Sequence, residues 1–211
     1  LSIMDFNNDN HWDVFISMID IFKNQMVIET SNKTSKIDEI RNTKLSKMGN
    51  KLFLGKKNGF SNGTQSIFEP KLHGWSWGNT FFDYDNDGDL DFYLTNGNFS
   101  VADGIKEEKN IFMINQNNKL WQSNSLSAES AAFNGRAVIA SDLNNNGKID
   151  LVVRTPAHII EFENLNQNKN TWVKIKLKGP TPNTYAIGSV IEVSTTTKTF
   201  RKIILPQTGF L

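Results

Sequence analysis

The sequence predicts an all-β fold: a partial β-propeller of about three four-stranded blades, followed by a truncated β-domain. Three observations support this prediction. A nine-residue pattern rich in Asp and Asn recurs at residues 5–13, 83–91 and 142–150. Each copy is followed by a short run of β-branched and aromatic residues, which favours a strand. The copies begin 78 and 59 residues apart, and a period of ~60 residues with several short strands per unit is typical of propeller blades.

The second repeat contains the clearest set of four strands. Residues 74–82 are expected to enter the loop as one strand, and residues 90–95 to leave it as the next. Residues 110–114 and 119–122 are the expected third and fourth strands, joined by a turn because residues 115–118 read Asn-Gln-Asn-Asn. Four strands per repeat fit a propeller blade.

The first repeat follows the same order but is longer. Strands are expected at residues 51–54 and near Phe60, around a turn at residues 56–59. The extra length is a polar stretch between residues 20 and 50. A short helix or a solvated loop is expected there. The helix is predicted from four apolar positions: Ile37, Ile40, Leu45 and Met48.

The third repeat enters its loop through residues 136–141 and ends with a strand at residues 158–162. A different pattern follows. Residues 171–178 alternate apolar residues with lysines, which predicts a strand with one buried face and one basic, wet face. Two further strands are expected at residues 186–193 and 199–205. We therefore divide the chain into propeller repeats, residues 1–166, and the start of another β-domain, residues 167–211.

The recurring pattern is suited to a hard cation. The second copy places carboxylates at positions 1, 3, 5 and 9, and glycine at position 6. Ca²⁺ prefers six to eight oxygens at about 2.3–2.6 Å, and like charges this close repel unless a cation lies among them. A helix–loop–helix calcium hand is rejected, because its bidentate Glu at position 12 is replaced by Ile16, Leu94 or Val153. The expected cofactor is Ca²⁺, bound in loops between strands.

The expected ligands occupy positions 1, 3, 5, 7 and 9 of each loop, with position 7 contributing its backbone carbonyl. Ligand charge tunes affinity, and the second, first and third loops offer four, three and two carboxylates. The alternative for each loop is a metal-free turn held by side-chain to backbone hydrogen bonds, and it weighs most on the third. The expected ligands are Asp83, Asp85, Asp87, Asp89 and Asp91; Asp5, Asn7, Asp9, His11 and Asp13; and Asp142, Asn144, Asn146, Lys148 and Asp150.

Composition argues against several classes of function. The net charge is +1 and the charges are mixed along the chain, so we expect neither nucleic acid nor a polybasic membrane anchor. No apolar run approaches the ~18–20 residues of a membrane span, and cysteine is absent. The histidines His11, His73 and His158 form no zinc spacing, and no Gly-x-Ser-x-Gly motif occurs. We therefore do not expect an enzyme.

Residues 74–97 contain Trp-x-Trp-Gly, then Phe before the acidic loop, then a strand ending in Asn-Gly, and Asn-Gly-Arg precedes the third loop at residues 134–136. These features resemble the FG-GAP/VCBS repeats of calcium-loop β-propellers, also found in integrin α-subunit heads, and most of all the cartilage acidic protein group. The first loop departs from the pattern with Asn10 at position 6. Asparagine tolerates the left-handed backbone conformation better than most residues, so this loop is kept as a weaker site.

The tail from Trp172, with Ala-Ile-Gly at residues 186–188, resembles the start of an ASPIC/UnbV domain. That domain usually continues past a Gly-aromatic-Leu such as residues 209–211, so the chain is expected to be a piece of a longer protein.

The resemblance implies a calcium-stabilised extracellular interaction module, secreted or at the cell surface, in which calcium has a structural role. Propellers of this kind serve adhesion, surface display and matrix binding, so the expected partner is a protein or glycan ligand on the propeller rim. The alternative is a non-catalytic or rim-loop portion of a secreted enzyme such as a hydrolase, since one fold hosts many functions.

Overall fold

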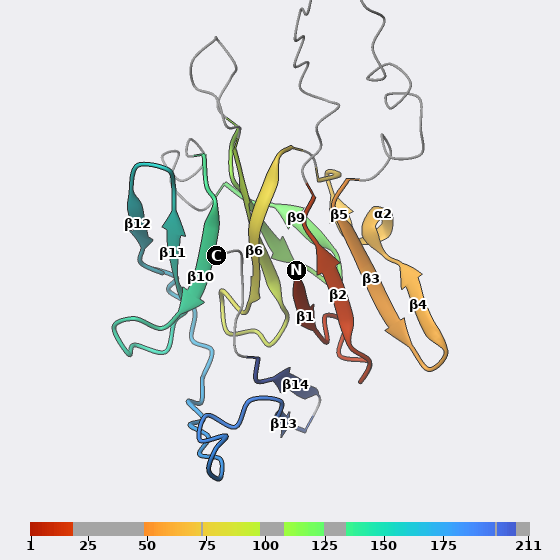
Figure 1. Ribbon diagram of the computed structural model, residues 1–211, viewed down its shortest axis with the longest axis vertical. Helices are drawn as coiled ribbons and strands as arrows, with labels where there is room; N and C mark the ends of the chain where they lie inside the picture. Colours follow the sequence, from red (N-terminus) through yellow and green to blue (C-terminus); the bar gives the residue numbers. More distant parts are fainter. Residues whose placement is uncertain (19–48, 73, 98–107, 125–133, 197, 206–211) are drawn as a thin grey trace, which may run out of the picture.

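A computed structural model describes residues 1–18, 49–72, 74–97, 108–124, 134–196 and 198–205. Within these residues the protein is all-β, with one short helix, α2 (Thr64–Ile67). The strands form four separate sheets (Figure 1), and the described residues show no closed propeller. No helix in these ranges is long and apolar enough to cross a membrane. The helix expected between residues 20 and 50 lies outside the described residues, as do His73 and residues 209–211.

The first sheet contains four antiparallel strands in chain order: β1 (Ser2–Met4), β2 (Asp13–Ile16), β3 (Lys51–Lys56) and β4 (Gly59–Asn62). Strand β2 begins at the last residue of the first acidic loop, because the β-branched and aromatic residues that favour a strand start there. The predicted strands of the first repeat and the turn between β3 and β4 are confirmed.

The second sheet contains the four predicted strands and one that was not predicted. Strands β6 (Ser76–Phe82), β7 (Asp91–Asn96), β8 (Ile111–Asn115) and β9 (Leu120–Gln122) are antiparallel neighbours. Strand β5 (Phe68–Glu69) adds a fifth, parallel to β9. The chain therefore contributes β5 to one edge of the second sheet before it forms β6 at the opposite edge.

The third sheet contains three described strands rather than the expected four: β10 (Ala137–Ser141), β11 (Asp150–Arg154) and β12 (Ile159–Phe162). After β12 the chain turns away, because Asn164 is held next to the third loop. Its backbone N–H donates to Asp150 Oδ1 at 2.8 Å, and its side-chain amide donates to the Ile149 carbonyl at 3.1 Å.

The C-terminal part forms a hairpin of β13 (Val190–Ser194) and β14 (Thr199–Ile203). The prediction of a strand at residues 171–178 is wrong. This segment has no strand assignment, and its apolar residues are exposed, with Val173 at 69% and Trp172 at 50%. The alternating pattern favours a strand only where a neighbouring strand supplies hydrogen bonds and a buried face. In this structure Trp172 and Lys174 of the segment contact the third loop instead.

The hydrophobic core lies between the sheets, and β7 is at its centre. All six residues of β7 are buried. Phe92 and Leu94 face a cluster shared with the first sheet, whereas Tyr93 faces a cluster shared with the third. Successive strand residues point to opposite faces, so this one strand joins the two clusters.

Trp75 belongs to the core, with only 5% of its surface exposed. Trp77 is more exposed and lies where the register of β6 and β7 shifts. Its indole N–H donates to the Gly97 carbonyl at 2.7 Å, and the Arg136 guanidinium lies 4.8 Å from its ring centroid. Because of the register shift, the two tryptophans do not share one environment.

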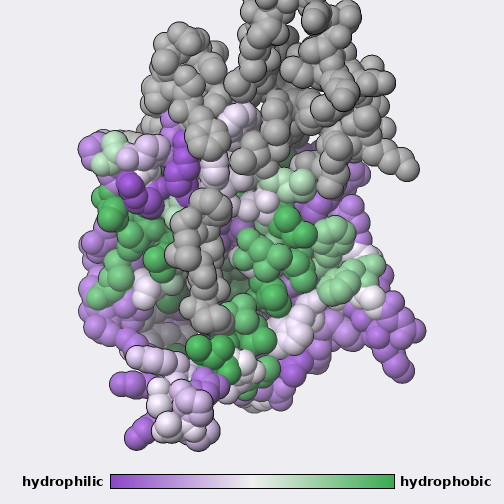
Figure 2. All heavy atoms as spheres, in the orientation of Figure 1, coloured by the Kyte–Doolittle hydropathy of each residue, from purple (hydrophilic) through white to green (hydrophobic). Residues whose placement is uncertain are grey.

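The third sheet is only partly covered by the described residues. Ile139 and Ile159 on its strands are 55% and 72% exposed. Figure 2 shows hydrophobic residues gathered over this sheet and over the sheet of β1 to β4.

Candidate metal centre

The three acidic loops lie at the same end of their sheets, which we call the loop end. Each loop joins the first two antiparallel strands of a sheet in chain order: β1 to β2, β6 to β7, and β10 to β11. Figure 1 shows all three at the lower end of the view. The hairpin β13–β14 contacts the first and second loops at this end.

The first aspartate of each loop closes the loop by accepting two backbone hydrogen bonds. The N–H groups of positions 5 and 6 donate to its two carboxylate oxygens. The distances are 3.0 and 3.0 Å at Asp5, 3.1 and 2.9 Å at Asp83, and 3.0 and 3.2 Å at Asp142. These are side-chain to backbone hydrogen bonds of the kind expected for the metal-free alternative, and they also curve the loop so that its side-chain oxygens converge.

The last aspartate of each loop ties the loop to two strands. One oxygen accepts the N–H of position 2, at 2.7 Å for Asp13, 2.7 Å for Asp91 and 3.0 Å for Asp150. The other accepts an N–H at or next to the third strand of the sheet, at 2.8 Å in each case, from Gly55, Asn115 and Asn164. All three aspartates are at most 2% exposed. This residue is therefore structural whether or not a metal binds.

The loop backbone enters the left-handed region at two positions. Position 6 has φ of 68° at Asn10, 87° at Gly88 and 84° at Gly147, so the expectation that Asn10 would substitute for glycine is confirmed. Position 4 is asparagine in every loop, with φ of 55° to 59° at Asn8, Asn86 and Asn145. Our sequence reasoning missed this second position, although the same residue type recurs there, and asparagine is among the few non-glycine residues that visit this conformation.

The second loop brings three carboxylates together. Asp83, Asp85 and Asp91 each place an oxygen within 4.8 Å of the others. One oxygen of Asp85 is buried and has no hydrogen-bond partner. Buried polar atoms are normally paired, so this oxygen and the converging charges fit a cation with oxygen ligands. Among the residues described, this is the one group of three or more His, Asp or Glu ligands that lie so close together.

Burial and mutual repulsion raise the pKa values of these acids. Burial is the largest cause at Asp91, whose pKa is raised to about 8, and at Asp83, whose pKa is raised to about 6. Burial also raises the pKa of Asp85, and the neighbouring Asp87 raises it further. A bound cation would favour the charged forms, so the second loop is electrostatically incomplete without one.

The remaining predicted ligands of the second loop have other roles in the structure. Asp87 is exposed, and its Oδ1 accepts the backbone N–H of Asp89 at 2.8 Å. The Asp89 side chain turns away and pairs with Lys198 Nζ at 2.8 Å, which raises the pKa of that lysine. This orientation fits the expectation that position 7 offers its backbone carbonyl rather than its side chain.

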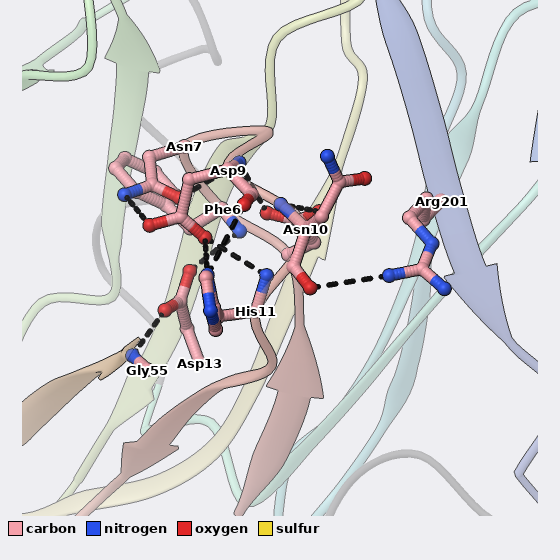
Figure 3. A network of polar contacts seen from close by, with 9 residues as sticks. Phe6, Asn7, Asp9, Asn10, His11, Asp13, Gly55 and Arg201 are labelled. Carbon is pink, nitrogen blue, oxygen red and sulfur yellow. Dashed lines mark hydrogen bonds and ion pairs between the residues drawn. The ribbon is translucent and has the colours of Figure 1, made fainter. Parts of the chain in front are cut away.

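The first loop holds its acids with its own donors (Figure 3). Asn7 Nδ2 donates to Asp9 Oδ2 at 3.0 Å, and His11 Nδ1 lies 3.2 Å from Asp9 Oδ1. Burial raises the pKa of Asp13 to about 6, and the charges of Asp9 and Asp5 raise it further. Asp5, Asp9 and Asp13 do not form a close group like that of the second loop, which agrees with the lower rank given to this loop.

The third loop gains an acid that the nine-residue pattern does not contain. Asn144 Nδ2 donates to Glu163 Oε1 at 3.0 Å, so a carboxylate from outside the pattern contacts this loop at position 3. Asn146 Oδ1 accepts the Lys148 backbone N–H at 2.8 Å. Glu163 follows β12 and lies outside the nine-residue pattern, so the pattern did not indicate it.

A pH series should reveal the buried acids when no metal is bound. Asp91, Asp83 and Asp13 have folded-state pKa values of about 8, 6 and 6 against an ordinary value of 3.8. Between about pH 4 and pH 8 the folded chain therefore binds more protons than the unfolded chain, and stability falls as pH rises. We expect the melting temperature in chelator to fall from pH 5 to pH 8.

Asp91→Asn should flatten this pH dependence, because asparagine does not titrate. A melting temperature that rises with pH in chelator would contradict the assignment.

Comparison with known protein families gives a result that agrees with the geometry of the loops. Residues 5–94 match the FG-GAP-like repeat. The FG-GAP-like match covers the first two loops and the strands between them. No curated protein and no solved structure matches the chain. The third loop lies outside the matched residues but has the same hydrogen bonds at its first and last aspartates as the two matched loops.

Proposed function

We propose that the protein is a calcium-stabilised extracellular interaction module in which calcium is structural. The observation that carries the proposal is the second loop, where three carboxylates converge and one buried oxygen lacks a partner. Asp83, Asp85 and Asp91 would hold the cation together with Asp87, and the cation would supply the positive charge that the buried acids lack. The loops lie between strands and lack the helix pair that turns calcium binding into a switch.

The finer family assignment is part of the same proposal. The Trp-x-Trp-Gly segment before the second loop and the Ala-Ile-Gly of residues 186–188 support a propeller of the cartilage acidic protein type followed by the start of an ASPIC/UnbV domain. Residues 1–166 would form the repeats and residues 167–211 the second domain. Weak calcium loops fill where calcium is millimolar, so a secreted or cell-surface location is proposed with them.

Calcium should raise the melting temperature of the chain. A ligand that binds only the folded state adds ~2.7 kcal/mol per site at a hundredfold excess over Kd. Asp87→Ala should remove more of this stabilisation than Asp142→Ala, because the second loop offers four carboxylates and the third loop two within the pattern. Differential scanning fluorimetry in calcium and in chelator measures both effects.

Magnesium is the control in these melts, since it demands near-ideal octahedral geometry and keeps much of its water. A melting temperature that is the same in calcium and in chelator would sink the calcium proposal.

The interaction role is tested separately from calcium. Arrays of matrix proteins and glycans probed in calcium and in chelator should show binding that depends on the folded repeats. Turnover in a hydrolase screen, without any bound partner, would instead favour the enzyme alternative.

A further inference from the structure

The C-terminal part of the chain lies across the loop end, near all three loops. Asn164 Nδ2 donates to the Tyr84 carbonyl at 2.8 Å, and Asn170 Nδ2 donates to the Asp85 carbonyl at 2.9 Å. Further along, the Trp172 indole lies against Gly147 of the third loop. Figure 1 shows β14 next to the lower ends of β1 and β6. The tail therefore packs on the same surface that carries the acidic loops.

The turn and second strand of the hairpin contact the second loop directly. Lys198 Nζ lies 2.8 Å from Asp89 Oδ1. The Phe200 ring covers Gly88, where an added Cβ would lie 2.5 Å from ring atoms. Glycine at position 6 thus provides both the left-handed backbone and the space for Phe200. The hairpin is seated on this loop by one ion pair and one aromatic contact.

The same strand reaches the first loop through Arg201. Its Nη1 donates to the Asn10 carbonyl at 3.2 Å (Figure 3), and its guanidinium lies 5.5 Å from the Trp12 ring centroid, within cation–π range. Glu192 on β13 lies 3.3 Å from Arg201 Nε and holds the side chain in place. Two basic residues of the hairpin therefore contact two acidic loops.

At the second loop, Lys198 and a divalent cation would weaken each other's binding. The loop bears five carboxylates within nine residues: Asp83, Asp85, Asp87, Asp89 and Asp91. Both Lys198 and a bound cation are attracted by this charge and repelled by each other. The Lys198 side chain is 43% exposed, so solvent screens the repulsion and the effect is modest.

We propose that the loop end is the docking surface for the hairpin β13–β14 and that docked Lys198 opposes calcium binding at the second loop. The inference rests on the calcium binding proposed above. Linkage makes the effect reciprocal: calcium weakens hairpin docking by the factor by which docked Lys198 weakens calcium. Hairpin docking is then tightest when calcium is scarce and weakens by the same modest factor as the loop fills.

Calcium titrations of the whole chain test the first half of this inference. Lys198→Met removes the charge and keeps much of the side-chain length, and should tighten calcium binding by about twofold to fivefold at low salt, the range of a surface ion pair. The gain should shrink at high salt, where such interactions are screened. Lys202→Met, at an exposed position of β14, is the matched control and should change nothing. Equal affinity of Lys198→Met and the unchanged chain would overturn the inference.

Limited trypsin digestion tests docking without relying on calcium. In chelator, the hairpin of the unchanged chain should be cut at Arg201 and Lys202 more slowly than in Asp89→Asn, which removes the partner of Lys198 and leaves the hairpin sequence intact. Adding calcium to the unchanged chain should speed the cut. Equal rates in chelator overturn the docking. If the chain binds no calcium but is still cut more slowly than Asp89→Asn in chelator, the proposed function and the calcium linkage are overturned. The docking of the hairpin is then still supported.

Discussion

Asp91→Ala is expected to lower the free energy of unfolding by about 2–5 kcal/mol even in chelator. Asp91 is 2% exposed and accepts the backbone N–H groups of Tyr84 at 2.7 Å and of Asn115 at 2.8 Å. Alanine would leave both donors without an acceptor, and each unsatisfied buried group costs about 1–3 kcal/mol. Urea unfolding of the whole chain in chelator measures the loss.

Asp87→Ala is the matched control within the same loop. Asp87 is exposed, and its carboxylate accepts one N–H, from Asp89, so its loss should cost less than about 1 kcal/mol in chelator. Both variants should nevertheless lose the calcium response of the second loop. Equal costs for the two variants in chelator would contradict the distinction between a last aspartate that is structural and a fifth-position aspartate that acts through calcium.

Much of the repeat architecture could be predicted because it is local in sequence. The strands next to each loop follow directly from runs such as residues 92–95, where aromatic, apolar and β-branched residues continue without a break. The loop backbone is also local, since the hydrogen bonds that close the loop join Asp83 to N–H groups only four and five positions later. The predicted convergence of oxygens in the second loop therefore needed no knowledge of the rest of the chain.

The features that were missed depend on distant partners. Strand β5 is two residues long and exists because Phe68 pairs with Leu120 of β9. Asn115 was expected in a turn, yet it ends β8 and holds both Asp91 and the Leu90 carbonyl. Residues 171–178 have a strand-like pattern but no neighbouring strand. Sequence periodicity reports which face of a segment is apolar, and it does not say which other segment will meet that face.

The loops and the core are linked through the same strand. Asp91 begins β7 and anchors the second loop, and Phe92 follows it in the core. A change in the position of Asp91 therefore also moves Phe92, the next residue, which packs between the sheets. This arrangement suits a structural cation, because stabilising the loop fixes the start of the strand that both hydrophobic clusters share.

Phe92→Ala is expected to lower the free energy of unfolding by about 3–5 kcal/mol, the usual cost of truncating a buried phenylalanine. Phe92 is fully buried, and its ring centroid lies 4.7 Å from Phe81, 4.8 Å from Phe15 and 5.3 Å from Phe68. Such aromatic pairs add to the burial of apolar area, and alanine would leave a cavity between the first and second sheets. Because domains are stable by only about 5–15 kcal/mol, this loss would remove a large part of the total stability.

Phe60→Ala is the control for this substitution, since Phe60 is 61% exposed on β4 and should change stability by less than about 0.5 kcal/mol. Urea unfolding followed by far-ultraviolet circular dichroism and by tryptophan fluorescence measures both variants. The two signals should coincide in the unchanged chain, because the Phe92 cluster joins the first sheet to the second and makes them unfold together. A cost below about 1 kcal/mol for Phe92→Ala, or two separate transitions in the unchanged chain, would mean that the sheets are not joined by this cluster.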